Sequence, residues 1–173
     1  MEKMEQTSAD YKRECMDQTL NDLRTYVEKA AREGTAAHEV ETGIWRRVLQ
    51  LGYQALEVFF TQVGPGDVGE SVVLPDGRQM HRLEALHRRV YQSIFGRFDL
   101  ERVVYGSREG QKIEYVPFDS RLQLPESALS YVLQDWSQGL AVEQAYRRVP
   151  ETLGRILDLH PSVDSLDSIG IFI

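Results

Sequence analysis

Basic side chains gather in the middle of the chain, between Arg78 and Lys112. This segment holds eight arginines and lysines against four acids, a local charge of +4. The whole chain of 173 residues has a formal charge of -7, so the remainder sums to -11. Guanidinium and ammonium groups bind phosphate, and His81 and His87 can add charge because imidazole titrates near neutral pH. We therefore expect a polyanion such as DNA to bind this segment, since the acidic remainder would repel it.

Carboxylates, nucleophiles and metal ligands form no recognisable catalytic pattern. Two-metal hydrolysis of nucleic acids needs convergent carboxylates, and only Asp99 and Asp119 approximate them. There is no Gly-x-Ser-x-Gly elbow, and the glycine-rich stretch 64–69 contains proline but no phosphate-loop lysine. The single Cys15 can form neither an internal disulfide nor a cysteine zinc site. The sequence predicts no enzyme, no metal and no cofactor, with a magnesium-dependent nuclease that uses the two aspartates as an alternative.

Composition places the chain among ordinary globular proteins. Apolar residues make up 42% and charged residues 27%, which excludes collagen-like and low-complexity chains. No stretch approaches the roughly 18 apolar residues of a membrane-spanning helix. The first residues lack an apolar signal core. We expect a cytoplasmic protein with no membrane partner.

Two long helices are predicted for residues 1–63. Over 8–32 the apolar positions recur at spacings of three and four, namely Met16, Leu20, Leu23, Val27 and Ala30. Gly34 ends this helix, and a second helix over 36–63 carries a wide apolar face. Such a face is normally buried on more than one neighbour. We expect a helical hairpin, and a dimerising coiled coil is the alternative for the row formed by Trp45, Leu49, Leu56 and Phe59.

Residues 70–117 are predicted to form an antiparallel β-ribbon. A short hairpin is expected around the turn Pro75-Asp76-Gly77. Segments 86–95 and 97–105 are rich in β-branched and aromatic residues, and 112–116 is a further candidate strand. Four arginines would then stand on the ribbon: Arg88, Arg97, Arg102 and Arg108. An ordinary solvated sheet face explains them as well as a DNA-facing surface does.

Residues 125–173 are predicted to form a helical bundle after an extended connector over 118–124. Helical periodicity covers 126–138, where Gly139 would be the cap, then 140–149, and Pro150 can begin a piece that ends at Leu157. Ser162 is a candidate N-cap for a last helix, so the outline resembles a truncated helix-turn-helix. The predicted fold class is α+β, with a long N-terminal helical hairpin, a small antiparallel β-meander and this bundle.

Several short motifs follow one another in a characteristic order. Gly66-Asp67-Val68-Gly69 precedes Phe95-Gly96-Arg97-Phe98, and a connector with leucines and Pro125 comes later. Between and after them stand Arg102, Tyr105, Val116, Pro117, Phe118, Asp119, Ser130, Tyr131, Ala145 and the stretch Ser162-Val163-Asp164-Ser165-Leu166. Over roughly residues 41–167 this pattern resembles the N-terminal part of bacterial insertion-sequence transposases of the Kra group. Phe118 stands where leucine is expected, and nothing in the sequence matches the family's catalytic DDE region.

The resemblance implies a non-catalytic segment of a transposase that binds transposon DNA or assembles subunits. Candidate phosphate contacts are Arg88, Arg89, Arg97, Arg102 and Arg108, with Arg147, Arg148 and Arg155 as a second row near the terminal helices. The expected partners are double-stranded DNA at the transposon ends, a second copy of the chain, and a separately encoded catalytic half. The alternative is a protein-interaction module that dimerises without binding DNA.

Overall fold

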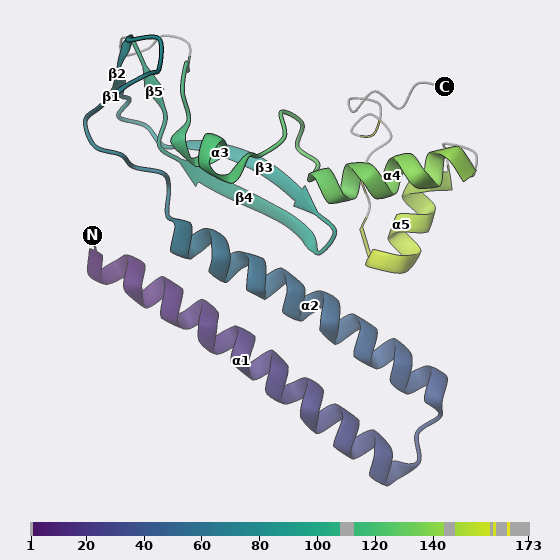
Figure 1. Cartoon of the computed structure of the whole chain (residues 1–173). Coiled ribbons are helices and arrows are strands. Elements are labelled where there is room, and N and C mark those ends of the chain that lie inside the picture. Colours follow the sequence, from purple (N-terminus) through teal and green to yellow (C-terminus); the bar gives the residue numbers. More distant parts are fainter. Residues whose placement is uncertain (1, 108–112, 144–147, 160, 162–165, 167–173) are drawn as a thin grey trace. The chain divides into compact units, whose positions relative to one another are not determined.

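The computed structural model describes residues 2–107, 113–143, 148–159, 161 and 166 of an α+β chain (Figure 1). The helices and the small antiparallel sheets confirm the α+β part of the predicted fold class. The chain divides into two compact units, which we call the helix pair (residues 1–62) and the sheet unit (residues 63–173). Within the described residues, no helix combines the length and the apolar character needed to cross a membrane.

The helix pair consists of α1 (Glu2–Glu33) and α2 (Ala37–Val63), which run side by side in opposite directions (Figure 1). Gly34 ends α1 as predicted, with a φ of +66° that favours glycine. Lys12 Nζ donates to Thr61 Oγ1 at 2.9 Å, and the Tyr26 hydroxyl donates to the Glu39 carbonyl at 3.1 Å. These contacts join the two helices near both ends of the pair.

The helix pair buries few side chains. Among its described side chains only Thr19, Ala30 and Val58 are buried. Leu20 and Val27, which belong to the predicted apolar stripe of α1, are exposed. Tyr26 lies against α2 instead, where the absence of a side chain at Gly43 makes room: a Cβ built there would stand 2.1 Å from the Tyr26 hydroxyl oxygen. The stripe that faces α2 is therefore displaced from the one that periodicity predicts.

The described strands of the sheet unit form two small antiparallel sheets. One has the order β1 (Ser71–Val73), β2 (Gln79–Arg82), β5 (Tyr105–Gly106), and the other pairs β3 (His87–Ser93) with β4 (Gly96–Arg102). The predicted hairpin around 75–77 and the predicted turn at Gly96 are both present. The single meander that the sequence suggested is divided, because β2 pairs with β5 and β3 pairs with β4.

The apolar core of the first sheet gathers around Met80, Val103 and Tyr105. Tyr105 is completely buried, so its hydroxyl needs partners within the protein. It donates to the Gly69 carbonyl at 2.7 Å and accepts from the Val68 amide at 3.1 Å. Tyr105 thereby attaches the loop after α2 to the sheet.

The connector after the sheets is helical rather than extended. α3 (Pro117–Leu122) begins with Pro117 in its first turn, where the missing N–H of proline is no disadvantage. Gln123, with a φ of +49°, ends it in the left-handed conformation. The prediction of an extended segment over 118–124 is therefore wrong.

The helices that follow begin later than predicted. Residues 128–130 lie beside Gln92 of β3, whose amide donates to the Ala128 carbonyl at 2.7 Å while its carbonyl accepts from the Ser130 amide at 2.8 Å. α4 (Tyr131–Glu143) therefore begins only after Ser130, whose hydroxyl accepts from the Leu133 amide. Gly139 lies inside α4 and does not cap it.

The end of the chain agrees with the prediction in one element. α5 (Val149–Leu157) has Pro150 in its first turn, as predicted. The described part of the predicted helix over 140–149 is divided between α4 and α5. The predicted helix after Ser162 lies outside the described residues except for Leu166, which is buried.

Replacing Gly66 with alanine should destabilise the sheet unit more than the same change at Gly64. Both glycines have positive φ, +80° and +71°, so both variants incur about 1–2 kcal/mol of backbone strain. A Cβ at Gly66 would also meet the backbone nitrogen and Cβ of Phe118 at 2.8 Å, whereas one at Gly64 meets nothing within 4 Å. We expect Gly66→Ala to lose about 1–3 kcal/mol more in urea unfolding. Equal losses would show that the close contact between Gly66 and Phe118 of α3 does not contribute to stability.

Candidate functional site

The register of β3 with β4 sorts the predicted phosphate-binding arginines onto two faces. Alternate residues of a strand point to opposite sides of the sheet. Arg88 pairs with Glu101 and Gln92 with Arg97, which places these residues on one face. Arg89 and Arg102 belong to the other face, which carries the buried side chains of Ser93, Phe98 and Leu100. The sequence segment is basic, but its arginines do not share one surface.

The outer face of this hairpin carries a balanced set of charges. Arg88 lies 3.7 Å from Glu101, and Arg97 lies 3.6 Å from Asp99, with all four side chains solvent-exposed. Two arginines and two acids on one face sum to zero. Arg88 and Arg97 are therefore poorly placed to attract a polyanion, because each has a carboxylate of the same face beside it.

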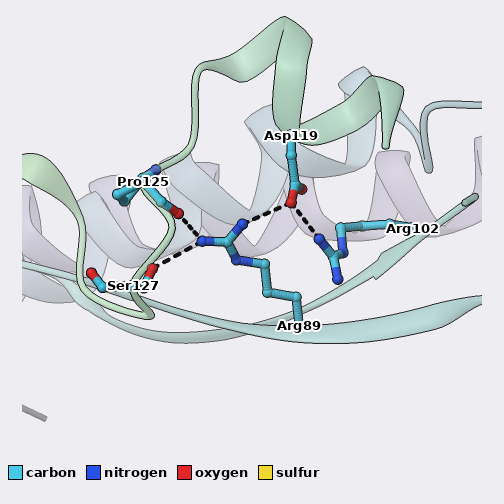
Figure 2. A network of polar contacts seen from close by, with 5 residues as sticks. All are labelled: Arg89, Arg102, Asp119, Pro125 and Ser127. Atoms are coloured by element: carbon cyan, nitrogen blue, oxygen red, sulfur yellow. Dashed lines mark hydrogen bonds and ion pairs between the residues drawn. The ribbon is translucent and has the colours of Figure 1, made fainter. Parts of the chain in front are cut away.

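The inner face contains a network of two arginines on one carboxylate (Figure 2). Asp119 of α3 accepts through Oδ2 from Arg89 Nη1 at 2.7 Å and also from Arg102 Nη1. The second amino group of Arg89 donates to the carbonyls of Ser127, at 2.9 Å, and Pro125. The Arg89 and Arg102 side chains are only 14% and 12% exposed.

Arg89 and Arg102 therefore contact the protein itself, and the expectation that they contact phosphate is not supported by their geometry. Their guanidinium groups hold α3 and the segment before α4 against the hairpin (Figure 2). Asp119 Oδ1 and Arg102 Nε are buried without a hydrogen-bond partner among the described residues. Burial on this face also raises the pKa of Tyr91, partly offset by its hydrogen bond with Ser130.

Asp99 and Asp119 do not converge on a metal position. Asp99 stands on the outer face of the hairpin, and Asp119 is occupied by the two arginines of the inner face. No group of three or more histidine, cysteine, aspartate or glutamate side chains among the described residues could hold a metal ion. The nuclease alternative therefore loses the pair of carboxylates on which it depended.

The remaining predicted arginines belong to the end of the chain or to undescribed positions. Arg108 and Arg147 lie outside the described residues. Arg148 precedes α5 and Arg155 lies in its last turn, and both are exposed. Seven residues separate them, which places them on one side of the helix, away from the buried Leu153.

Comparisons with known proteins give no assignment. A scan against protein-family models and searches of curated proteins and solved structures find no match. The geometry of the chain itself therefore carries the functional argument.

The four candidate dimerisation residues lie on α2. Trp45 is 43% exposed and Phe59 is 46% exposed, while Leu49 and Leu56 are partly buried. α1 contacts α2 elsewhere, through Gly43, Arg47 and Thr61. At 100° per residue these contacts lie on the opposite side of α2 from Trp45 and Phe59. The apolar row thus faces away from the seam between the two helices.

Two features of the structure are not predicted from the sequence: the structural role of Asp119 and a cluster of basic side chains on the helix pair. Asp119 was considered as a metal ligand, although its two arginines are its partners. The sequence feature that points to a structural role of Asp119 is its place two residues after Pro117, at a helix N-terminus, where a carboxylate is favourable. Lys29, Arg46 and Arg47 lie close together on the helix pair. No single basic segment predicts this cluster, because its members come from two helices.

Asp119→Ala should unfold the sheet unit more readily than Asp99→Ala. Removing one partner of a largely buried ion pair leaves its arginines uncompensated, so we expect a loss of about 3 kcal/mol. The Asp99 pair is exposed on the outer face, and its removal should cost less than about 1 kcal/mol. Urea unfolding followed by circular dichroism measures both. Similar losses for the two variants would contradict a structural role of the network.

Proposed function

We propose that the chain is a non-catalytic assembly module that dimerises through α2, as the assembly role of the transposase segments that it resembles implies. The observation that carries this proposal is the row of large apolar side chains on the side of α2 opposite α1, in which Trp45 and Phe59 are nearly half exposed. A second copy of the chain is the occupant that the row fits best.

The row is nearly symmetric about Gly52. Trp45 and Phe59 each lie seven residues from this glycine, and Leu49 and Leu56 lie three and four residues from it. If two α2 helices crossed antiparallel at Gly52, Trp45 of one copy would face Phe59 of the other. A two-fold dimer needs such a self-complementary surface.

The energetics of the helix pair favour a further partner. Two helices with three buried residues among their described side chains have little core of their own. Burying a large apolar side chain completely contributes roughly 1.5–3 kcal/mol, and Trp45 and Phe59 have about half of this still to gain. The row extends about 21 Å along the helix at 1.5 Å per residue. Pairing would therefore supply the core that the helix pair lacks.

DNA binding is a second candidate, and one observation favours it. Arg148 and Arg155 present two exposed guanidinium groups on one face of α5, whereas the ribbon arginines are paired with acids. Transposon-end DNA would be contacted through its phosphates at α5 rather than on the ribbon. A separately encoded catalytic half is the partner that the resemblance implies for such an assembly.

Phe59→Glu should convert a dimer into a monomer without unfolding the chain. The side chain is half exposed, so a charge there is tolerated in one copy but would be buried in the pair. We expect light scattering coupled to size-exclusion chromatography to report twice the chain mass for the parent protein and one chain mass for the variant.

The matched control adds the same charge to the solvent side of α1. Asn21→Glu is exposed and should leave the dimer intact. A parent protein that is monomeric at high concentration, or a dimer that survives Phe59→Glu, would refute pairing through this row.

Arg148→Ala combined with Arg155→Ala should weaken binding to duplex DNA at low salt. Each lost phosphate contact lowers the slope of log affinity against log salt by about 0.9, so the pair should lower it by about 1.8. Arg88→Ala combined with Arg97→Ala removes the same charge from the ribbon and should lower the slope much less. Gel shifts over a salt series measure this, and an equal effect of the two double variants would remove α5 from the proposal.

A further inference from the structure

A groove lies between α1 and α2 within the helix pair. Its volume is about 460 Å³, which is in the range of small-molecule sites. The groove is lined by Thr19, Asp22, Thr25, Tyr26 and Lys29 of α1 and by Arg46, Arg47 and Gln50 of α2. It uses neither the apolar row of α2 nor any residue of the sheet unit, so it is independent of the proposed dimer.

Cations dominate the lining of this groove. Lys29, Arg46 and Arg47 stand against the single carboxylate of Asp22, which gives the lining a net charge of +2 in a chain of -7. Lys29 lies 3.9 Å from Glu33, an exposed and loose pair. Arg46 has no hydrogen bond or ion pair with the described residues. An excess of positive charge in a concave surface attracts anions.

Arg47 is held in position before any ligand arrives. Its guanidinium carbon lies 3.8 Å above the centre of the Tyr26 ring, and Nη1 donates to the Gly43 carbonyl at 2.9 Å. Tyr26 is itself fixed by its hydrogen bond to the Glu39 carbonyl. A pre-oriented guanidinium loses little entropy on binding.

Thr19 supplies a second, uncharged feature of the groove. The residue is 6% exposed and lines the groove. A hydroxyl can donate to an anionic oxygen that arginine contacts from the other side.

We infer that this groove binds the phosphate group of a small anion. Two guanidinium groups and an ammonium group suit the charge and the several oxygens of phosphate, and arginine can bind it through two parallel hydrogen bonds. Arg46 and Lys29 would close on the anion from the two helices, and Thr19 would donate from the floor. The phosphate can belong to a small molecule or to a nucleic-acid backbone.

Titration of the full chain with inorganic pyrophosphate by calorimetry at low salt tests this site. Saturable binding is expected, and Arg46→Gln should weaken it about tenfold, as the loss of a charge-assisted hydrogen bond implies. Arg24→Gln is the matched control, since it removes the same charge from an exposed position of α1 that does not line the groove. Thr19→Val, which keeps the shape of the side chain, should weaken binding by about threefold or more.

Competition with a short DNA duplex separates the two sources of phosphate. If the duplex displaces pyrophosphate and itself binds more weakly to Arg46→Gln, the site accepts a nucleic-acid backbone. If the duplex does not compete, the site is one for small phosphorylated molecules. The absence of saturable pyrophosphate binding, or equal weakening by Arg46→Gln and Arg24→Gln in variants with unchanged circular dichroism, would overturn the proposal.

Discussion

The carboxylate of Asp119 holds together elements that are distant in the sequence. It accepts from an arginine of β3 and an arginine of β4, and Arg89 extends the network to the carbonyls of Pro125 and Ser127. The hairpin, α3 and the segment before α4 are thereby fixed against one another (Figure 2). Because the guanidinium groups of Arg89 and Arg102 bind Asp119, these two positive charges of the basic segment are used inside the sheet unit.

Several residues that carry the resemblance to transposases meet in the same structure. Arg102 contacts Asp119, and Tyr105 contacts the backbone of Val68 and Gly69. Gly66 leaves room for Phe118, which is buried. These motif residues are thus explained by packing and hydrogen bonding within one unit. A functional role in DNA recognition would have to come from other side chains.

Sequence periodicity was sufficient for the long helices and the turns, because glycine and proline mark them clearly. Gly34, the Pro75-Asp76-Gly77 turn, Gly96 and Pro150 all take the predicted places. The start of α4 was not predictable in this way, since residues 128–130 bind the edge of β3, a contact between distant segments. Local propensity contains no information on such a partner.

The candidate sites were predicted less well than the fold for the same reason. A count of arginines along the chain found a basic segment, but strand register decides which face each arginine occupies. The row on α2 was found because helical spacing alone places its members on one side. The groove was not found, because Lys29 and the arginines of α2 meet only when the two helices pack. A candidate site that lies on one helix can be predicted from helical spacing, whereas a site formed by two packed helices cannot.

Antiparallel pairing of α2 about Gly52 is the central claim, and a disulfide measures it directly. In a chain with Cys15→Ser, the variant Gly52→Cys would bring two cysteines together at the two-fold axis, within the roughly 4.4–6.8 Å between Cα atoms that a disulfide requires. We predict a covalent dimer on mild oxidation for Gly52→Cys and none for Arg24→Cys on the solvent side of α1. No crosslink at Gly52, or equal crosslinking at both positions, would contradict the account.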